Sequence, residues 1–173
     1  MSSKSNLRSP IVISETHPSE AVHIADQLHR AFYGVAWHGP AVIELLDDID
    51  VTAAAARPIA NVHNIWELLL HIEAWDRAAI VRIGGNKCQP TGTDNFPLPP
   101  PRPTAAAWQK AIKQAKQTHD ALVKQVASLS EEQLRTRCPG KRYDLYHLLH
   151  GVAQHELYHA GQIAILKKAA LRS

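Results

Sequence analysis

The chain has 173 residues, of which 45% are hydrophobic and 20% charged, and its formal net charge is +3. This composition predicts one globular domain and argues against an intrinsically disordered protein. Lysine and arginine are scattered, so we expect no nucleic-acid partner. Two cysteines without a C-x-x-C pair argue against a disulfide framework or a cysteine zinc site. No apolar run is long enough to span a bilayer, and we expect a cytoplasmic protein that does not bind membranes.

The first helix follows a short N-terminal segment. Residues 1–16 are predicted to be a flexible arm, and residues 17–173 a single domain. Helical periodicity begins near Glu20 and resumes after Gly39 and Pro40. The pattern therefore predicts one long helix with a kink at Pro40, or two helices in line.

Three further helices are predicted downstream. The second begins near His63 and Asn64 and runs to about Ile83, where two glycines end it. The third follows Thr104, a predicted N-cap, and runs to about Ser128. A short capping-box helix follows at residues 130–133, and the last long helix spans about 144–171. The absence of strand alternation predicts an all-α fold, a four-helix bundle with a long loop between helices 2 and 3.

That long loop covers about residues 84–103 and is rich in proline, glycine, threonine and asparagine. A loop of this length in a compact domain is usually a lid, a partner contact or a disordered span. An insert without function is an equally good interpretation.

The last helix carries His155 and His159, which lie on adjacent turns within its apolar stripe. Burying two imidazoles is unfavourable unless each finds a partner, and a divalent metal would satisfy both. The letters H-E-L-Y-H also match the H-E-x-x-H helix of zinc proteases. That interpretation lacks a third ligand, because no His, Asp or Glu follows His159, and Gln162 and Ile165 stand where the extended motif has Gly and His.

His71 in the second helix is the candidate third ligand, because it too is flanked by apolar residues. Three histidines from two helices would leave an open coordination position, as catalytic metal sites do. Zinc is the preferred ion, and nickel, iron and cobalt are alternatives. A histidine that is merely hydrogen-bonded in the core is the simpler interpretation for any one of them.

Two stretches carry a family resemblance: residues 66–75 (WELLLHIEAW) and residues 155–163 (HELYHAGQI). Together they resemble the DinB/YfiT-like superfamily of metal-binding four-helix bundles. The resemblance implies a metal ligand in the second helix and a pair in the last, here His71, His155 and His159. It also implies a metal-dependent enzyme, often a homodimer. Characterised relatives include S-transferases that use low-molecular-weight thiols such as bacillithiol or mycothiol, a mycothiol-dependent isomerase, and presumed hydrolases.

Four other residues are candidates for supporting or catalytic roles. Glu67 is expected to orient His71 or to be a fourth ligand, unless it is a solvated carboxylate. Glu156 is a candidate general base, although a surface salt bridge is the simpler prediction. His38 would face the metal cavity and His63 would flank its mouth, unless each is only a cap or a hydrogen-bonded core residue.

These observations predict a metal-dependent enzyme that activates a water or thiol nucleophile for attack on a small-molecule substrate. With water the enzyme would be a hydrolase, and with a thiol an S-transferase. Two alternatives belong to other classes: a metal-binding or sensing bundle without turnover, and a structural bundle whose histidines hold no metal.

Overall fold

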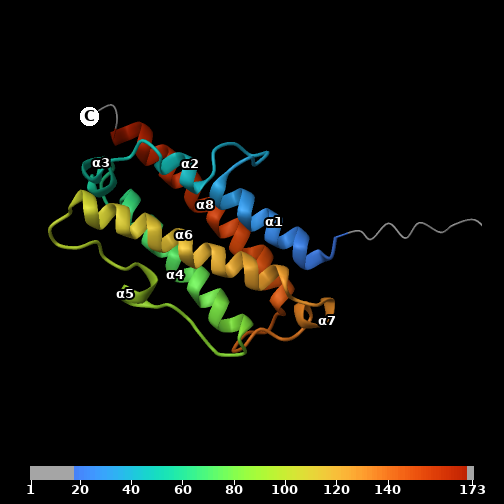
Figure 1. The fold of residues 1–173 in the computed structure, drawn as a ribbon. Coiled ribbons are helices and arrows are strands. Elements are labelled where there is room, and N and C mark those ends of the chain that lie inside the picture. Colours follow the sequence, from blue (N-terminus) through green and yellow to red (C-terminus); the bar gives the residue numbers. More distant parts are fainter. Residues whose placement is uncertain (1–17, 171–173) are drawn as a thin grey trace, which may run out of the picture.

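The computed structural model describes residues 18–170, which form helices and no strand. Helix α4 contacts α6 and α8, and α1 contacts the same two helices, so the four form a bundle (Figure 1). The prediction of an all-α fold is confirmed. The predicted arm at residues 1–16 and the predicted helix end near Leu171 lie outside the described residues. The four long helices are α1 (Glu20–Tyr33), α4 (Ile65–Ile83), α6 (Ala105–Ala127) and α8 (Leu145–Ala170).

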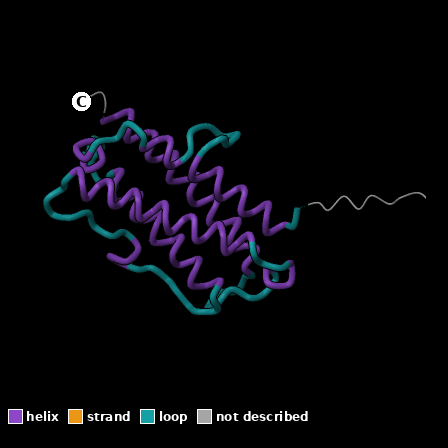
Figure 2. The backbone as a smooth tube through the Cα atoms, viewed as in Figure 1, coloured by secondary structure: helices purple, strands orange, loops and turns teal. Residues whose placement is uncertain are grey.

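Four short helices lie in the connections between the long ones (Figure 2). None of the helices within residues 18–170 is both long enough and apolar enough to cross a bilayer. The short helices are α2 (Val42–Leu46), α3 (Val51–Ala55), α5 (Gly92–Asn95) and α7 (Glu131–Leu134).

Of the two alternatives for the first helix, the single long helix with a kink at Pro40 is wrong, because α1 ends at Tyr33. Two separate helices form instead, α1 and the short α2 that begins at Val42. Gly34 has φ 135°, in a region that favours glycine, and Val35 follows with φ 59°. A Cβ at Gly34 would lie 2.7 Å from the carboxyl group of Glu44, so a larger residue has no room there. Glu44 in turn accepts a hydrogen bond from Ala41 N at the start of α2.

The starts of α4, α6 and α7 agree with the sequence predictions. Asn64 accepts a hydrogen bond from Glu67 N, and Glu67 accepts one from Asn64 N, which forms a capping box for α4. Thr104 caps α6 and Ser130 caps α7 through the same kind of side-chain acceptor. These local signals determine the residues at which α4 and α6 begin.

The core consists of two apolar clusters, one at each end of the bundle. The first contains Trp66 and Trp108, with ring centroids 5.1 Å apart. The second is built from α1, α6, α7, the first half of α8, Ala79 of α4 and Cys138. Buried Asp76, His119 and Glu156 belong to neither cluster, so the interior also contains charged groups.

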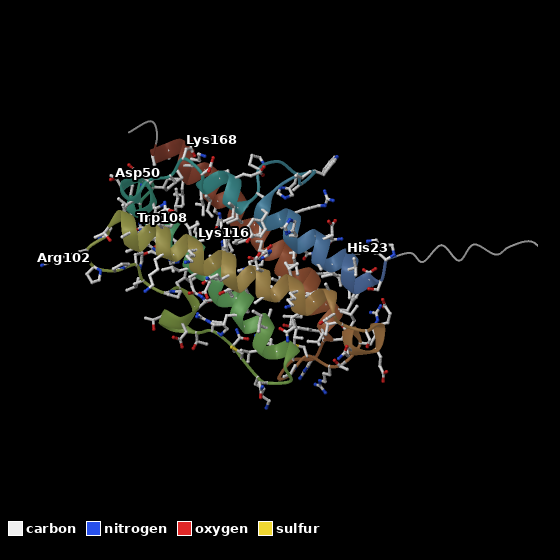
Figure 3. The ribbon with its side chains drawn as sticks, in the orientation of Figure 1. His23, Asp50, Arg102, Trp108, Lys116 and Lys168 are labelled. Atoms are coloured by element: carbon white, nitrogen blue, oxygen red, sulfur yellow. The ribbon has the colours of Figure 1, made fainter. Side chains whose placement is uncertain are left out.

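Trp108 offers a test of this packing, because it is 1% exposed and its Nε1 donates to Ile49 O at 2.8 Å (Figure 3). Replacing Trp108 with Phe leaves that buried carbonyl unpaired. We expect the free energy of unfolding to fall by about 1–3 kcal/mol, measured by urea denaturation. Trp37→Phe is the matched control, because Trp37 is fully exposed and its replacement should not move the midpoint. Equal effects of the two substitutions would contradict the role given to Trp108.

Candidate metal centre

The structure brings the three predicted histidines together at the contact between α4 and α8. His71 comes from α4, and His155 and His159 come from adjacent turns of α8. The Nε2 atom of His155 lies 2.9 Å from Nε2 of His71 and 3.0 Å from Nε2 of His159. Three ring nitrogens therefore point at one small volume.

The outer nitrogens of two rings are held by acceptors. His71 Nδ1 lies 2.5 Å from the carbonyl oxygen of Asn95, and His159 Nδ1 lies 2.7 Å from Oε1 of Gln162. Because these oxygens only accept, both Nδ1 atoms carry a proton, and both Nε2 atoms of the neutral rings present lone pairs. His155 Nε2 can donate to at most one of them. Converging lone pairs of this kind fit a bound cation.

The site also keeps these imidazoles neutral. Burial, assisted by the neighbouring imidazoles, lowers the pKa of His71 to about 4 and of His155 to about 3. Burial likewise lowers the pKa of His159. Metal binding requires the neutral form of histidine, so the ligand set is ready at pH 7. Three neutral imidazole nitrogens form a donor set that can hold a divalent metal ion.

The loop at residues 84–103 forms a wall of this site, beside α4 (Figure 1). Its α5 segment supplies the Asn95 carbonyl for His71, and Asn95 Oδ1 accepts from Trp75 Nε1 at 2.8 Å. Phe96 stacks on His71 with ring centroids 3.9 Å apart. The loop is therefore attached to the histidines by contacts of its own and is not an insert without contacts.

Two cavities adjoin His159. The first, called the triad cavity here, has a volume of about 440 Å³ and contains all three rings in its lining. The second, called the apolar cavity, has a volume of about 480 Å³ and is lined mainly by aliphatic and aromatic side chains. His159 and Tyr158 line both cavities. The site can thus be approached from two sides.

The comparisons with known proteins bear on these histidines. A family model described as the DinB superfamily matches residues 23–163, a span that contains all three. The chain belongs to the DinB superfamily. No curated protein and no solved structure gives a significant match. The resemblance seen in the two sequence stretches is therefore confirmed for most of this DinB-superfamily chain.

Glu67 does not occupy the position that the sequence predicted for it. The side chain is 2% exposed, so a solvated carboxylate is wrong. Its oxygens accept from Arg57, from Asn64 N and from the ring of His63. Burial opposes its ionisation, but these donors outweigh burial and lower its pKa. The group that orients His71 is instead the carbonyl of the loop.

The two histidines predicted to surround the site differ in their placement. His63 stacks on Phe96, with ring centroids 3.7 Å apart, and lines the apolar cavity together with His159. His38 is exposed and lines a separate hollow of about 260 Å³ beside Trp37. The expectation that His38 faces the metal cavity is wrong, because the turn that follows α1 carries it to that separate hollow.

Glu156 is also misplaced by the sequence prediction. Its side chain is 0% exposed, which rules out the predicted surface salt bridge. It faces His119 and Asp76, whereas adjacent His155 faces His71. Consecutive residues of a helix point about 100° apart, so in this DinB-superfamily protein His155 and Glu156 contact different groups of residues.

Sequence reasoning missed several residues of the site. Gln162 lies three residues after His159, and this helical spacing is a signal that could have found it. Asn95 and Phe96 carry no such signal, because their contacts with His71 depend on how a loop folds back.

The hydrogen bond between His159 and Gln162 leads to a test. Gln162→Ala removes the acceptor that fixes the His159 ring, and loss of such a partner weakens metal binding by about 10- to 100-fold. The affinity for Zn²⁺ can be measured by competition with a chromophoric chelator. Gln154→Ala is the control, because Gln154 is exposed on the same helix and lines the hollow beside Trp37. Equal affinities for both variants would contradict the orienting role.

Proposed function

We propose that this protein is a metal-dependent enzyme that transfers a low-molecular-weight thiol to a small electrophilic substrate. The observation that carries the proposal is the meeting of two cavities at His159, each large enough for a small molecule. A site for one substrate and water needs only one such cavity. Zinc is the proposed metal, with nickel, iron or cobalt as alternatives. The cytoplasmic location and the homodimer stay predictions.

The histidines are proposed to act as ligands through their Nε2 atoms. A divalent metal held by His71, His155 and His159 would supply Lewis acidity, which lowers the pKa of a bound thiol or water. Because the three rings are neutral, they leave the positive charge uncompensated and so favour an anionic nucleophile. Asn95 and Gln162 hold two of the rings in orientation.

Arg82 supports an anionic ligand in the triad cavity. Its side chain is buried in the lining of that cavity, and its guanidinium lies 5.5 Å from the centroid of the Trp75 ring. The acceptors for Nε and Nη2 are neutral, namely the carbonyl of Cys88 and the side chain of Gln89. Its positive charge can therefore attract a thiolate or a carboxylate on the thiol.

The remaining steps are assigned to the cavity walls. His147 is exposed and lines the triad cavity, where its ring can accept the proton that the thiol releases. Side chains such as Val62, Phe96 and Ile165 would hold an apolar electrophile in the other cavity. The sulfur then forms a bond to the electrophilic carbon, while the leaving group departs with its bonding electrons and takes up the proton.

The first test is metal content together with activity. We expect His71→Ala and His159→Ala each to remove one metal ion per chain from untagged protein, measured by elemental analysis, and to lower thiol transfer by roughly 100-fold or more. His23→Ala is the control, since His23 is an exposed histidine on α1 (Figure 3) and does not belong to the triad.

The assay would pair cysteine, glutathione, bacillithiol and mycothiol with alkyl halides, epoxides and esters. Ester hydrolysis without thiol consumption would replace the transferase by a hydrolase. Bound metal without turnover over the whole panel would instead favour a binding or sensing protein.

A second test separates the two cavities. Gly151 lines the triad cavity, and a Cβ added to it would meet no atom within 4 Å. Gly151→Leu should therefore raise the KM for the thiol by roughly 10-fold while changing the KM for the electrophile little. Gly161→Leu is matched to it, because Gly161 lies on the same helix, has equal space, and is not in the lining of either cavity. A rise in both KM values would contradict separate binding places.

A further inference from the structure

We propose that Asp76, His119 and Glu156 form a second divalent-metal site, distinct from the histidine triad. The residues come from three helices, α4, α6 and α8, and one ligand atom of each lies within 4.8 Å of the others. His119 Nδ1 is 3.1 Å from Asp76 Oδ2 and 3.2 Å from Glu156 Oε1. Atoms bonded to one ion at about 2.0–2.2 Å lie roughly 3.0–3.5 Å apart, and both distances from His119 fall in this range.

The polar atoms of this cluster are buried and short of partners. Exposure is 1% for Asp76 and 0% for His119 and Glu156. His119 Nδ1 donates to Asp76 Oδ2 and also contacts Glu156 Oε1, whereas Asp76 Oδ1, Glu156 Oε2 and His119 Nε2 have no hydrogen-bond partner. Such unpaired oxygens are costly in an interior without water. A cation at the centre would satisfy oxygens of both carboxylates at once.

A bound cation would also balance the charges of the cluster. A divalent ion with two carboxylates and a neutral imidazole is neutral overall. Both oxygens of each carboxylate can also bind, so the three side chains offer enough donors for a complete coordination shell. Mixed oxygen and nitrogen ligands suit Mn²⁺, Fe²⁺ or Zn²⁺.

The cluster lies in a layer between the two apolar clusters of the core. On α4, Asp76 stands between Ile72 of the first cluster and Ala79 of the second. On α8, Glu156 stands between Ala153 of the second cluster and Ala160 of the first.

The third helix repeats this order, because His119 on α6 stands between Ala115 of the first cluster and Leu122 of the second. Phe32 of α1 covers the imidazole, with centroids 4.1 Å apart and planes 9° from parallel. None of the three side chains lines the triad cavity or the apolar cavity. A closed site of this kind is structural, and it would hold α4, α6 and α8 together.

The test is the number of metal ions per chain. Untagged protein is purified from cells supplied with Mn²⁺, Fe²⁺ and Zn²⁺, and its metals are counted by elemental analysis. We expect two ions for the wild type, one for His71→Ala/His159→Ala, one for Asp76→Asn/Glu156→Gln, and none for the combination. This proposal does not rest on the enzymatic one, because the triad variant should keep one ion whether or not the protein is an enzyme.

The proposal is overturned if Asp76→Asn/Glu156→Gln retains as many ions as the wild type, or if the triad variant retains none. Glu73→Gln is the matched control. Glu73 is buried on α4 and accepts from Thr118 of α6 at 3.0 Å, so its loss disturbs the same helices and should leave the metal count unchanged.

A second measurement covers the case in which the neutral variants do not fold. The melting temperature of the triad variant is followed by circular dichroism with and without prolonged dialysis against dipicolinate. Loss of a structural ion should lower it, and added Mn²⁺ or Zn²⁺ should restore it. A melting temperature that neither the chelator nor the metals change would show that the cluster is only an ion pair, and the proposal would fail.

Discussion

The burial of ionisable side chains between α4 and α8 is the constraint on which the rest of the structure depends. It places ionisable side chains of both helices in an interior where an unpaired polar atom is costly. Burial keeps the imidazoles of His71 and His155 unprotonated, and this lowers the free-energy cost of burying them. Acceptors for the outer nitrogens of His71 and His159 lower it further. The lone pairs of the Nε2 atoms still point at one another, and they are the chemical basis for a metal centre.

The need of buried polar atoms for partners also explains why the long connection between α4 and α6 lies against the bundle. Asn95 provides an acceptor that neither helix could supply to His71, and Phe96 covers the face of the same ring. Phe96 also packs on His63, so the loop contacts the start of α4 as well as its middle. The mouth of the site is therefore shaped by the connection between α4 and α6. Substrate preference is expected to reside in this segment.

Neighbouring residues of α8 lie in two different environments, an open cavity and a closed layer of the core. His155 lines the triad cavity, which a small molecule can enter, and Glu156 points into a closed layer with His119. Open sites suit chemistry because a position remains for a substrate, and closed ones suit stability. A rigid helix that connects both would hold the triad in place while its other face fixes the packing of α4 and α6. The proposed enzyme would thus keep reactivity and structural support on separate faces of one element.

Local signals in the sequence determined the all-α class and the starts of α4 and α6, because caps such as Asn64 and Thr104 act within one turn. Spacing and apolar neighbours also sufficed to single out His155 and His159. The end of α1 at Tyr33 was decided by the tertiary structure, where Glu44 packs against Gly34. So was the cluster around His119, which the sequence shows only as one more residue on an apolar face. Periodicity tells which face of a helix is buried. It does not tell which side chain of another helix will meet it, since that depends on the register and angle at which the helices pack.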